Sequence, residues 1–188
     1  TGVLPVFVGR ATRGVEFFEH AEKTYETVLL LGRTTDTQDV TGTVLAEKAV
    51  HLSPADIEKV LPRFRGDILQ VPPMYSALKV NGRKLYELAR KGQEVERQPR
   101  PITVFELTNL GFDGTRLSLR VKCSKGTYIR TLCQDIGEAL GCGGCMEALR
   151  RVRAGEYGIE DAVPLEQLLE SETPERYLRG LDTMFAHC

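Results

Sequence analysis

The segment from residue 102 to residue 123 restricts the fold more than any other part of the chain. From Arg116 to Cys123, apolar and polar residues alternate without interruption, as in a strand with one buried face. Residues 102–112 are also strand-like, and Asp113-Gly114 between the two stretches is a strong hairpin signal. The sequence predicts an antiparallel hairpin with a core face and an opposite face that carries a row of basic side chains.

Strand-like and helical patterns are interspersed along the rest of the chain. Ser53 followed by Pro54 is a typical helix start, because serine caps the first turn and proline fits the first helical position. The patterns predict strands over 24–32, 42–50, 102–112, 115–123 and 148–153, helices over 11–22, 53–64, 83–91, 127–140 and 164–170, and a polar loop over 33–41. Because hairpins pair the strands, the predicted class is α+β, with a mixed, mostly antiparallel sheet flanked by helices.

Length and overall charge exclude several classes of protein. A chain of 188 residues, 41% of them hydrophobic, is long enough for one globular domain. Its net charge of -1 is unlike that of a uniformly basic nucleic-acid-binding protein or an acidic disordered tail. The longest apolar run, residues 28–31, is far shorter than the roughly 20 residues of a membrane span. Residue 1 does not begin a signal-peptide pattern, so we expect a cytoplasmic protein.

The neutral total conceals an uneven distribution of charge. Residues 79–100 contain seven basic and three acidic residues, and residues 116–130 contain five basic residues and no acidic one. Residues 154–175 contain seven acidic residues and neither lysine nor arginine. A charged partner must therefore bind to a local patch.

The five cysteines are an odd number scattered along the chain, which is typical of reduced thiols rather than of a disulfide framework. Cys142 and Cys145 form one C-x-x-C pair, but a zinc site needs four ligands, and no second such pair or histidine pair follows. Incidental loop cysteines are the favoured interpretation. A thiol or metal protein built on this pair is the alternative.

The predicted hairpin runs into residues 124–130, Ser-Lys-Gly-Thr-Tyr-Ile-Arg, and then into a helix. The free N–H groups of a helix start, next to Lys125 and the flexible Gly126, form a potential anion site. Arg130 lies about one turn further on, where its guanidinium could hold a carboxylate or phosphate through two hydrogen bonds. An ordinary surface arginine at a helix start explains the spacing equally well.

Residues 72–90 combine aromatic and basic side chains. Pro72 and Pro73 give an extended entry, and Asn81-Gly82 gives a tight turn. Tyrosines interleaved with cations suit phosphate contacts together with stacking on unpaired bases, and these residues are Tyr75, Lys79, Arg83, Lys84, Tyr86 and Arg90. A basic hairpin whose tyrosines simply pack is the alternative.

Six motifs follow one another over nearly the whole chain. They are Lys-Thr-Tyr-Glu (23–26), Gly-Arg-Thr-Thr-Asp-Thr-Gln-Asp (32–39), Val-Pro-Pro-Met-Tyr-Ser-Ala-Leu-Lys (71–79), Arg-Pro-Ile-Thr-Val-Phe-Glu-Leu (100–107), Cys-Ser-Lys-Gly-Thr-Tyr-Ile-Arg (123–130) and Leu-Arg-Arg (149–151). In order and spacing these motifs resemble the bacterial TruB family, the tRNA pseudouridine-55 synthases. The resemblance implies a pseudouridine synthase fold and isomerisation of a T-loop uridine of tRNA, without metal or cofactor. The residues alone support an RNA-binding α+β domain.

The resemblance assigns two catalytic roles. Tyr25 matches the tyrosine that stacks on the flipped base and takes the proton from C5 of the uracil. Arg130 matches the arginine that pairs with the catalytic aspartate. A base must leave its stack before protein side chains can act on it, so the implied enzyme needs a pocket with stacking walls.

The resemblance also places the substrate-binding residues. Tyr128 and Leu149 match residues that line the base pocket, and Lys125 is expected at the pocket edge. The segment 71–90, with Tyr75 and Lys79, is expected to contact the T arm of the tRNA. The implied protein is a monomer that binds no membrane.

The family's nucleophilic aspartate has no counterpart here. It lies in a Gly-Thr-Leu-Asp-Pro stretch, and Thr1-Gly-Val-Leu-Pro matches the residues that follow. We interpret Asp36 and Asp39 as turn residues of a polar loop. The implied organisation is a partial catalytic domain over 1–188, in which 164–188 begin the segment that leads to a missing C-terminal RNA-binding domain. The chain is expected to be inactive, and Arg130 to be left without its carboxylate.

A non-catalytic tRNA-binding or RNA-remodelling module is the alternative function. In that case the RNA-binding groove is present and the nucleophile is truly lacking.

Overall fold

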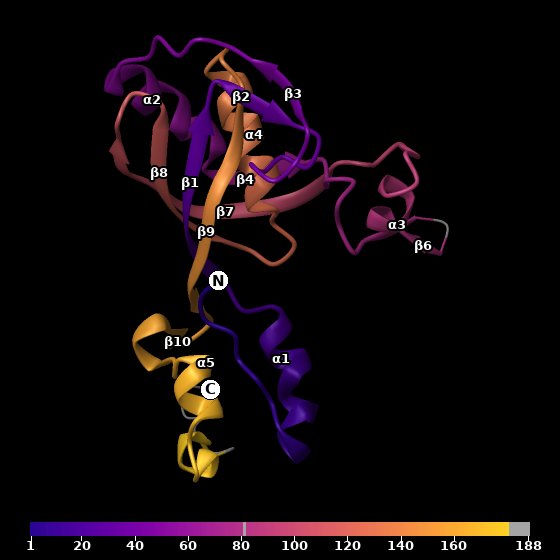
Figure 1. Ribbon diagram of the computed structural model, residues 1–188, viewed down its shortest axis with the longest axis vertical. Coiled ribbons are helices and arrows are strands. Elements are labelled where there is room, and N and C mark those ends of the chain that lie inside the picture. The colour runs from indigo at the N-terminus through magenta and orange to yellow at the C-terminus, as the bar shows by residue number, and fades with distance from the viewer. Residues whose placement is uncertain (81, 181–188) are drawn as a thin grey trace.

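A central antiparallel sheet of six strands organises the protein (Figure 1). The computed structural model describes residues 1–80 and 82–180. The strand order is β10-β9-β1-β8-β7-β4, and each neighbouring pair is antiparallel. The strands are β1 (Lys23–Leu31), β4 (Gly66–Gln70), β7 (Arg100–Phe112), β8 (Arg116–Cys123), β9 (Gly144–Ala154) and β10 (Tyr157–Gly158). The predicted α+β class with a mostly antiparallel sheet is confirmed.

Two helices cover one face of this sheet. They are α2 (Pro54–Val60), which continues as a 3-10 helix (Leu61–Phe64), and α4 (Ile129–Ala139). Ile57 of α2 and Ile136 of α4 are fully buried in the same cluster as Leu29 of β1 and Leu119 of β8. Burial of each such side chain stabilises the fold by about 1.5–3 kcal/mol. The core therefore lies between the sheet and these two helices.

The remaining elements are short. β2 (Arg33–Thr35) pairs with β3 (Val44–Glu47), and β5 (Lys79–Val80) pairs with β6 (Arg83–Lys84). The short helices are 3-10 Gly9–Gly14, α1 (Val15–Glu19), α3 (Leu85–Ala89), 3-10 Ile159–Asp161, α5 (Leu165–Leu169) and 3-10 Pro174–Tyr177. Both α1 and α5 lie beyond the end of the sheet at which the N-terminus is found (Figure 1). No helix in the described residues is long and apolar enough to cross a membrane.

The opposite face of the sheet carries the basic row predicted for β8, but glutamates on neighbouring elements neutralise it. Arg116 pairs with Glu147 at 2.7 Å and Arg120 with Glu26 at 2.6 Å. Lys122 contacts Glu22 at 2.9 Å and, more distantly, a second glutamate on β7. The basic row of β8 is therefore a series of ion pairs rather than a row of free cations.

Residues 71–99, between β4 and β7, form a projection that we call the arm (Figure 1). β5, β6 and α3 belong to it. The predicted tight turn at 81–82 joins β5 to β6, with Gly82 at φ +79°, although residue 81 lies outside the described residues. At the base of the arm, Arg97 Nη1 donates to the carbonyl oxygen of Pro72 at 3.2 Å.

Several predicted elements differ from the structure. The predicted helix over 83–91 is two strand residues followed by α3, and that over 11–22 is the 3-10 helix Gly9–Gly14 followed by the five residues of α1. β4 was not predicted, because a five-residue edge strand with few apolar residues gives little alternation. β2 lies inside the predicted loop over 33–41. β9 has 11 residues instead of the six predicted, because it begins four residues earlier, near the buried Cys145, and ends one later, at the buried Ala154.

Candidate active site

Two of the residues predicted to contact the base lie together on the core face of the sheet. Tyr25 is on β1, where its cross-strand partners are Val121 on β8 and Arg151 on β9. Leu149 precedes Arg151 by two positions on β9 and is therefore a diagonal neighbour of Tyr25. Both Tyr25 and Leu149 are half-buried and pack against the core cluster.

The N-terminal residues run parallel to β9 beside this pair. Gly2 pairs with Arg151, whose N–H donates to the Thr1 carbonyl at 3.1 Å and whose carbonyl accepts from the Val3 N–H at 2.8 Å. A Cβ at position 2 would come within 2.2 Å of the Arg151 carbonyl oxygen, and φ is +110°, so glycine is required there. The amino group of Thr1 lies 3.3 Å from the Leu149 carbonyl oxygen. A residue that precedes Thr1 would therefore begin beside Leu149.

Arg130 lies in the first turn of α4 and joins three segments. Its Nη1 donates to Asp39 Oδ2 at 3.1 Å, and its Nη2 donates to the Tyr75 carbonyl oxygen in the arm at 2.8 Å. Nη1 also lies 3.4 Å from the Thr37 carbonyl oxygen. The side chains of Arg130 and Asp39 are 26% and 16% exposed, so the ion pair is largely shielded from water. It connects the arm, α4 and the loop after β2.

Asp39 was interpreted as a turn residue, and its hydrogen bond from the Thr41 N–H is typical of one. The expectation that Arg130 lacks a carboxylate is wrong, because Arg130 pairs with Asp39. Oδ1 of Asp39 accepts from Thr37 Oγ1 at 2.9 Å and from the Thr41 N–H at 3.0 Å, while Oδ2 binds Arg130. Burial alone would raise the pKa of Asp39, but hydrogen bonds from Thr41 and Thr37 and the charge of Arg130 lower it. Both oxygens of this ionised carboxylate are engaged. Asp39 and Arg130 are 91 positions apart, and no local pattern joins them.

Tyr128 caps the N-terminus of α4 and is fixed by Gln70 at the end of β4. The Tyr128 N–H donates to Gln70 Oε1 at 2.8 Å, and Gln70 Nε2 donates to the Tyr128 carbonyl oxygen at 3.1 Å. Gln70 is 2% exposed. Sequence reasoning missed this residue. The only signal was a polar residue directly before Val71 and the two prolines, which is a weak one.

Lys125 and Tyr128 line the same pocket at the base of the arm. Its volume is about 320 Å³, and its walls are Gln70, Pro72, Leu78, Arg100, Pro101, Ile102, Lys125, Gly126 and Tyr128. Lys125 Nζ lies 3.0 Å from His20 Nε2. Lys125 is a lining residue of this pocket, and neither Tyr25 nor Leu149 is among its walls. Lys79 is exposed on β5 of the arm. Tyr75 is linked to α4 through Arg130.

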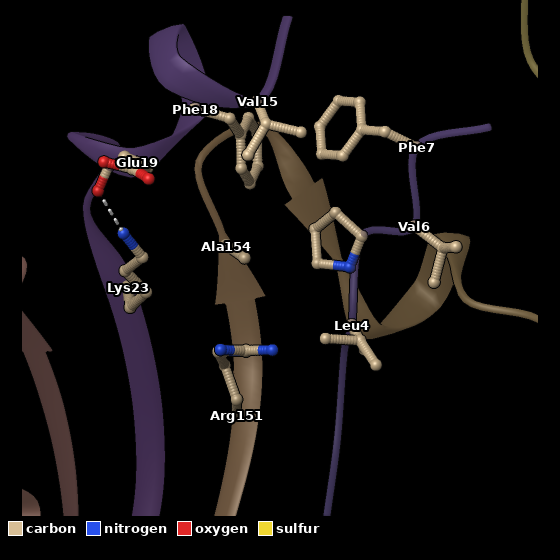
Figure 2. Close-up of a pocket in the computed structure, with 10 residues that line it drawn as sticks. Leu4, Val6, Phe7, Val15, Phe18, Glu19, Lys23, Arg151 and Ala154 are labelled. Carbon is tan, nitrogen blue, oxygen red and sulfur yellow. Dashed lines mark hydrogen bonds between the residues drawn. The ribbon is translucent and has the colours of Figure 1, made fainter. Parts of the chain in front are cut away.

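A second pocket of about 430 Å³ lies between the N-terminal segment, α1 and the ends of β1 and β9 (Figure 2). Its apolar wall contains Leu4, Pro5, Val6, Phe7, Val15 and Phe18. Lys23 and Arg151 are its two cations, and both are drawn in Figure 2. Arg151 Nε donates to the Val3 carbonyl oxygen at 2.6 Å.

Tyr25 is a neutral phenol in this setting. Burial and the neighbouring Cys123 raise its pKa, while a hydrogen bond from the Arg151 side chain and the charge of Arg151 act in the opposite direction. Because its pKa is raised, Tyr25 can act as a base only if a nearby positive charge, such as that of Arg151, stabilises the phenolate form.

The cysteines in the described part of the chain are buried thiols. They are Cys123, Cys133, Cys142 and Cys145. Cys142 lies in the turn between α4 and β9, as interpreted, whereas Cys145 is on β9 rather than in a loop. Burial raises the pKa of Cys123 to about 11 and that of Cys133 to about 12, which makes them poor nucleophiles. Among the described residues, no group of three or more histidine, cysteine or acidic side chains could hold a metal ion.

Comparison with solved structures defines the class of protein. The chain is similar to a chain in a crystal structure of a Cbf5–Nop10–Gar1 complex, with a TM-score of 0.70 and 30% identity, over 93% of this chain and 43% of that one. A second similar structure is an H/ACA RNP bound to a substrate RNA containing 2'-deoxyuridine, with a TM-score of 0.65 and 26% identity, over 93% of this chain and 42% of that one. The fold is that of a pseudouridine synthase.

Comparison of sequences defines the family. A model of the N-terminal domain of TruB family pseudouridylate synthases matches residues 1–129, and a model of the tRNA pseudouridylate synthase B C-terminal domain matches residues 130–184. The chain belongs to the TruB family.

Two curated relatives show how much of such a protein the chain represents. A tRNA pseudouridine synthase B from Pseudomonas fluorescens is 53% identical over 168 residues, which are 89% of this chain and 55% of that protein. The protein of the same name from Azoarcus sp. is 49% identical over an alignment of 189 residues that covers 100% of this chain and 63% of that protein. The chain thus spans less than two thirds of either relative.

Proposed function

We propose that the protein represented by this chain isomerises a uridine of tRNA to pseudouridine, at position 55 in the T loop. The observation that carries the proposal is that Tyr25 and Leu149 are diagonal neighbours on the core face of the sheet, at the place where the N-terminal segment joins β9. The shared name of the curated relatives, tRNA pseudouridine synthase B, supports the substrate.

The reaction breaks the bond between N1 of uracil and C1' of the ribose, turns the base, and forms a bond between C5 and C1'. The C5 proton is then released, and C5 needs a base beside it. Tyr25 is the proposed acceptor, assisted by the Arg151 hydrogen bond that opposes the rise in the Tyr25 pKa. The uridine must be turned out of the loop, and unpaired T-loop bases make this less costly than in a duplex. No metal or cofactor takes part in this scheme.

The proposed nucleophile is an aspartate that precedes Thr1 in the complete protein. Thr1 is held beside the Leu149 carbonyl, so a preceding segment would enter next to Tyr25 and Leu149. Asp39 is a poor substitute, because its two oxygens already accept hydrogen bonds from threonines and from Arg130. The 188-residue chain is therefore proposed to be inactive alone.

The remaining predicted residues are proposed to bind the tRNA. Tyr128 forms a wall for the base and Lys125 holds RNA at the pocket edge. Tyr75 and Lys79 contact the T arm from the arm of the protein. In this proposal the protein is a cytoplasmic monomer, and residues 1–188 are part of its catalytic domain, with 164–188 leading toward a further domain.

Release of tritium from tRNA labelled at uridine C5 tests the function. We would compare the 188-residue chain with a version preceded by the residues found upstream of the match in the Pseudomonas fluorescens relative. We expect no release from the first and one tritium per tRNA from the second. Tyr25→Phe in the extended version should reduce turnover at least roughly a hundredfold while tRNA affinity is kept.

Three outcomes contradict parts of this scheme. Tritium release by the 188-residue chain alone would remove the proposed upstream nucleophile. Full turnover by Tyr25→Phe would remove its role as the base. Tight tRNA binding by an extended version that releases no tritium would favour the non-catalytic RNA-binding module.

A further inference from the structure

Three cations gather at the start of β1, beside Tyr25. Lys23 is two positions before Tyr25 on the same strand and lies between Cys123 on β8 and Ala154 on β9. Lys125 follows Cys123 by two positions, and Arg151 is the cross-strand partner of Tyr25. Strand register therefore brings three cations to one end of the sheet. We call Lys23, Lys125 and Arg151 the cation cluster.

The cation cluster differs from the basic row of β8 in how its charges are met. Lys23 Nζ donates to the Glu19 carbonyl oxygen at 2.9 Å, Arg151 Nε donates to a backbone carbonyl, and Lys125 contacts His20. Within the described residues, no carboxylate lies within salt-bridge distance of these three cations. The cations of β8, by contrast, are each paired with glutamate.

The pKa of Lys23 is lowered, first by burial and then by the neighbouring cations Arg151 and Lys125. The Glu19 carboxylate raises it, but this is the weakest of the influences and does not restore the ordinary value. Like charges held together in a partly buried place destabilise the protein unless an anion joins them.

The shape of the adjoining pocket indicates what kind of anion fits. Lys23 and Arg151 line a pocket that also contains Glu19 and an apolar wall that includes Phe7 and Phe18 (Figure 2). A small inorganic anion would leave that wall bare. A nucleotide unit supplies a phosphate for the cations and a ribose or base for the apolar wall.

We propose that Lys23, Lys125 and Arg151 bind a backbone phosphate of the RNA loop, close to the nucleotide that Tyr25 contacts. This inference rests on the proposed function for the identity of the RNA. It adds a fixed anchor for the RNA backbone next to the site of chemistry. In the free protein the cluster is a set of unpaired charges, and RNA binding completes it.

The first experiment measures tRNA affinity of the 188-residue chain against salt concentration, with an unmodified tRNA transcript as the probe. Lys23→Ala and Lys125→Ala should each weaken binding about tenfold, as expected for one charge-assisted contact. Each should also flatten the slope of log affinity against log salt by about one unit. Lys59→Ala, at an exposed lysine of α2 that pairs with Asp56, is the matched control and should leave both unchanged.

The second experiment identifies the phosphate. T-arm stem-loops that each carry one uncharged methylphosphonate are titrated with the chain and with Lys23→Ala. We expect one loop position at which the substitution weakens binding of the unaltered chain about tenfold and has little further effect on Lys23→Ala. Equal, additive losses at every position would overturn the proposal. Thermal melts of each variant ensure that only folded protein is compared.

The outcomes also separate this inference from the proposed function. Unchanged salt slopes for Lys23→Ala and Lys125→Ala in a chain that still binds tRNA would overturn the phosphate site alone. Competition by millimolar inorganic phosphate, with no position-specific effect of methylphosphonate, would show a free-anion site and also overturn it. An extended version that releases no tritium, while the salt slopes of Lys23→Ala and Lys125→Ala are still flattened, would overturn the proposed function alone.

Discussion

Gln70 provides the sharpest test of the geometry at the start of α4. Its buried amide makes two hydrogen bonds with the main chain of Tyr128, at 2.8 and 3.1 Å. Gln70→Met keeps the length and approximate volume of the side chain but removes both bonds. The Tyr128 carbonyl also accepts from the Leu132 N–H within the helix, so the main loss is a partner for the Tyr128 N–H. An unsatisfied N–H costs about 1–3 kcal/mol and a lost hydrogen bond about 1 kcal/mol.

We therefore expect Gln70→Met to lower the free energy of unfolding by about 2–3 kcal/mol, and the melting temperature by about 5–10 °C. Urea and thermal denaturation measure both quantities. Gln98→Met changes an exposed glutamine in the same way and should stay within about 0.5 kcal/mol of the unaltered chain.

Gln70→Glu refines the test, because its carboxyl group can donate to the Tyr128 carbonyl only when protonated. Its deficit in stability should thus be smaller at pH 5 than at pH 8. A loss below about 0.5 kcal/mol for Gln70→Met would refute the idea that this amide holds the helix start.

Two further predictions concern carboxylates. Asp39→Asn should destabilise the protein by about 2 kcal/mol at pH 7, which is less than for a fully buried ion pair because Arg130 is partly exposed. Folding lowers the pKa of Asp39, so the difference in stability from the unaltered chain should shrink below pH 4. Acid titrations of unfolding measure this difference. Burial, followed by the charge of Glu138, raises the pKa of Asp135 to about 6. The folded state therefore loses stability as pH rises from about 4 to 6, and Asp135→Asn should be more stable by about 1 kcal/mol at pH 7, allowing for solvent screening, with no gain at pH 4. An Asp135→Asn melting temperature at or below that of the unaltered chain at pH 7 would contradict this account.

The elements predicted correctly from the sequence are those marked by alternation, a turn signal or a helix cap within a few residues. The hairpin of β7 and β8 follows from alternation and from Asp113-Gly114, and the start of α2 follows from Ser53, whose side chain and N–H both exchange hydrogen bonds with Asp56. β4 escaped prediction because its pairing with β7, rather than its own five residues, makes it a strand. Propensity is a weak guide for such short edge strands.

The candidate site was predictable in part for a related reason. Resemblance to a family singled out Tyr25, Arg130 and Leu149, but no pattern in the sequence joins Arg130 to Asp39 or Tyr128 to Gln70. These contacts bridge 91 and 58 positions, and only the folded sheet creates them. The unpaired charge of the cation cluster is likewise a product of strand register, since each of its members is an ordinary basic residue in the sequence.

The order of the strands has a consequence for synthesis of the protein on the ribosome. β1 is complete at residue 31, but its neighbours β8 and β9 end only at residues 123 and 154. At about 5–20 residues per second, an apolar strand waits roughly 6–25 s for its second partner to be made. Until residue 123 is made, Val28, Leu29, Leu30 and Leu31 have neither flanking strand, and they lack β9 until residue 154. The nascent chain is therefore a natural client for chaperones that shield apolar segments until translation has passed β9.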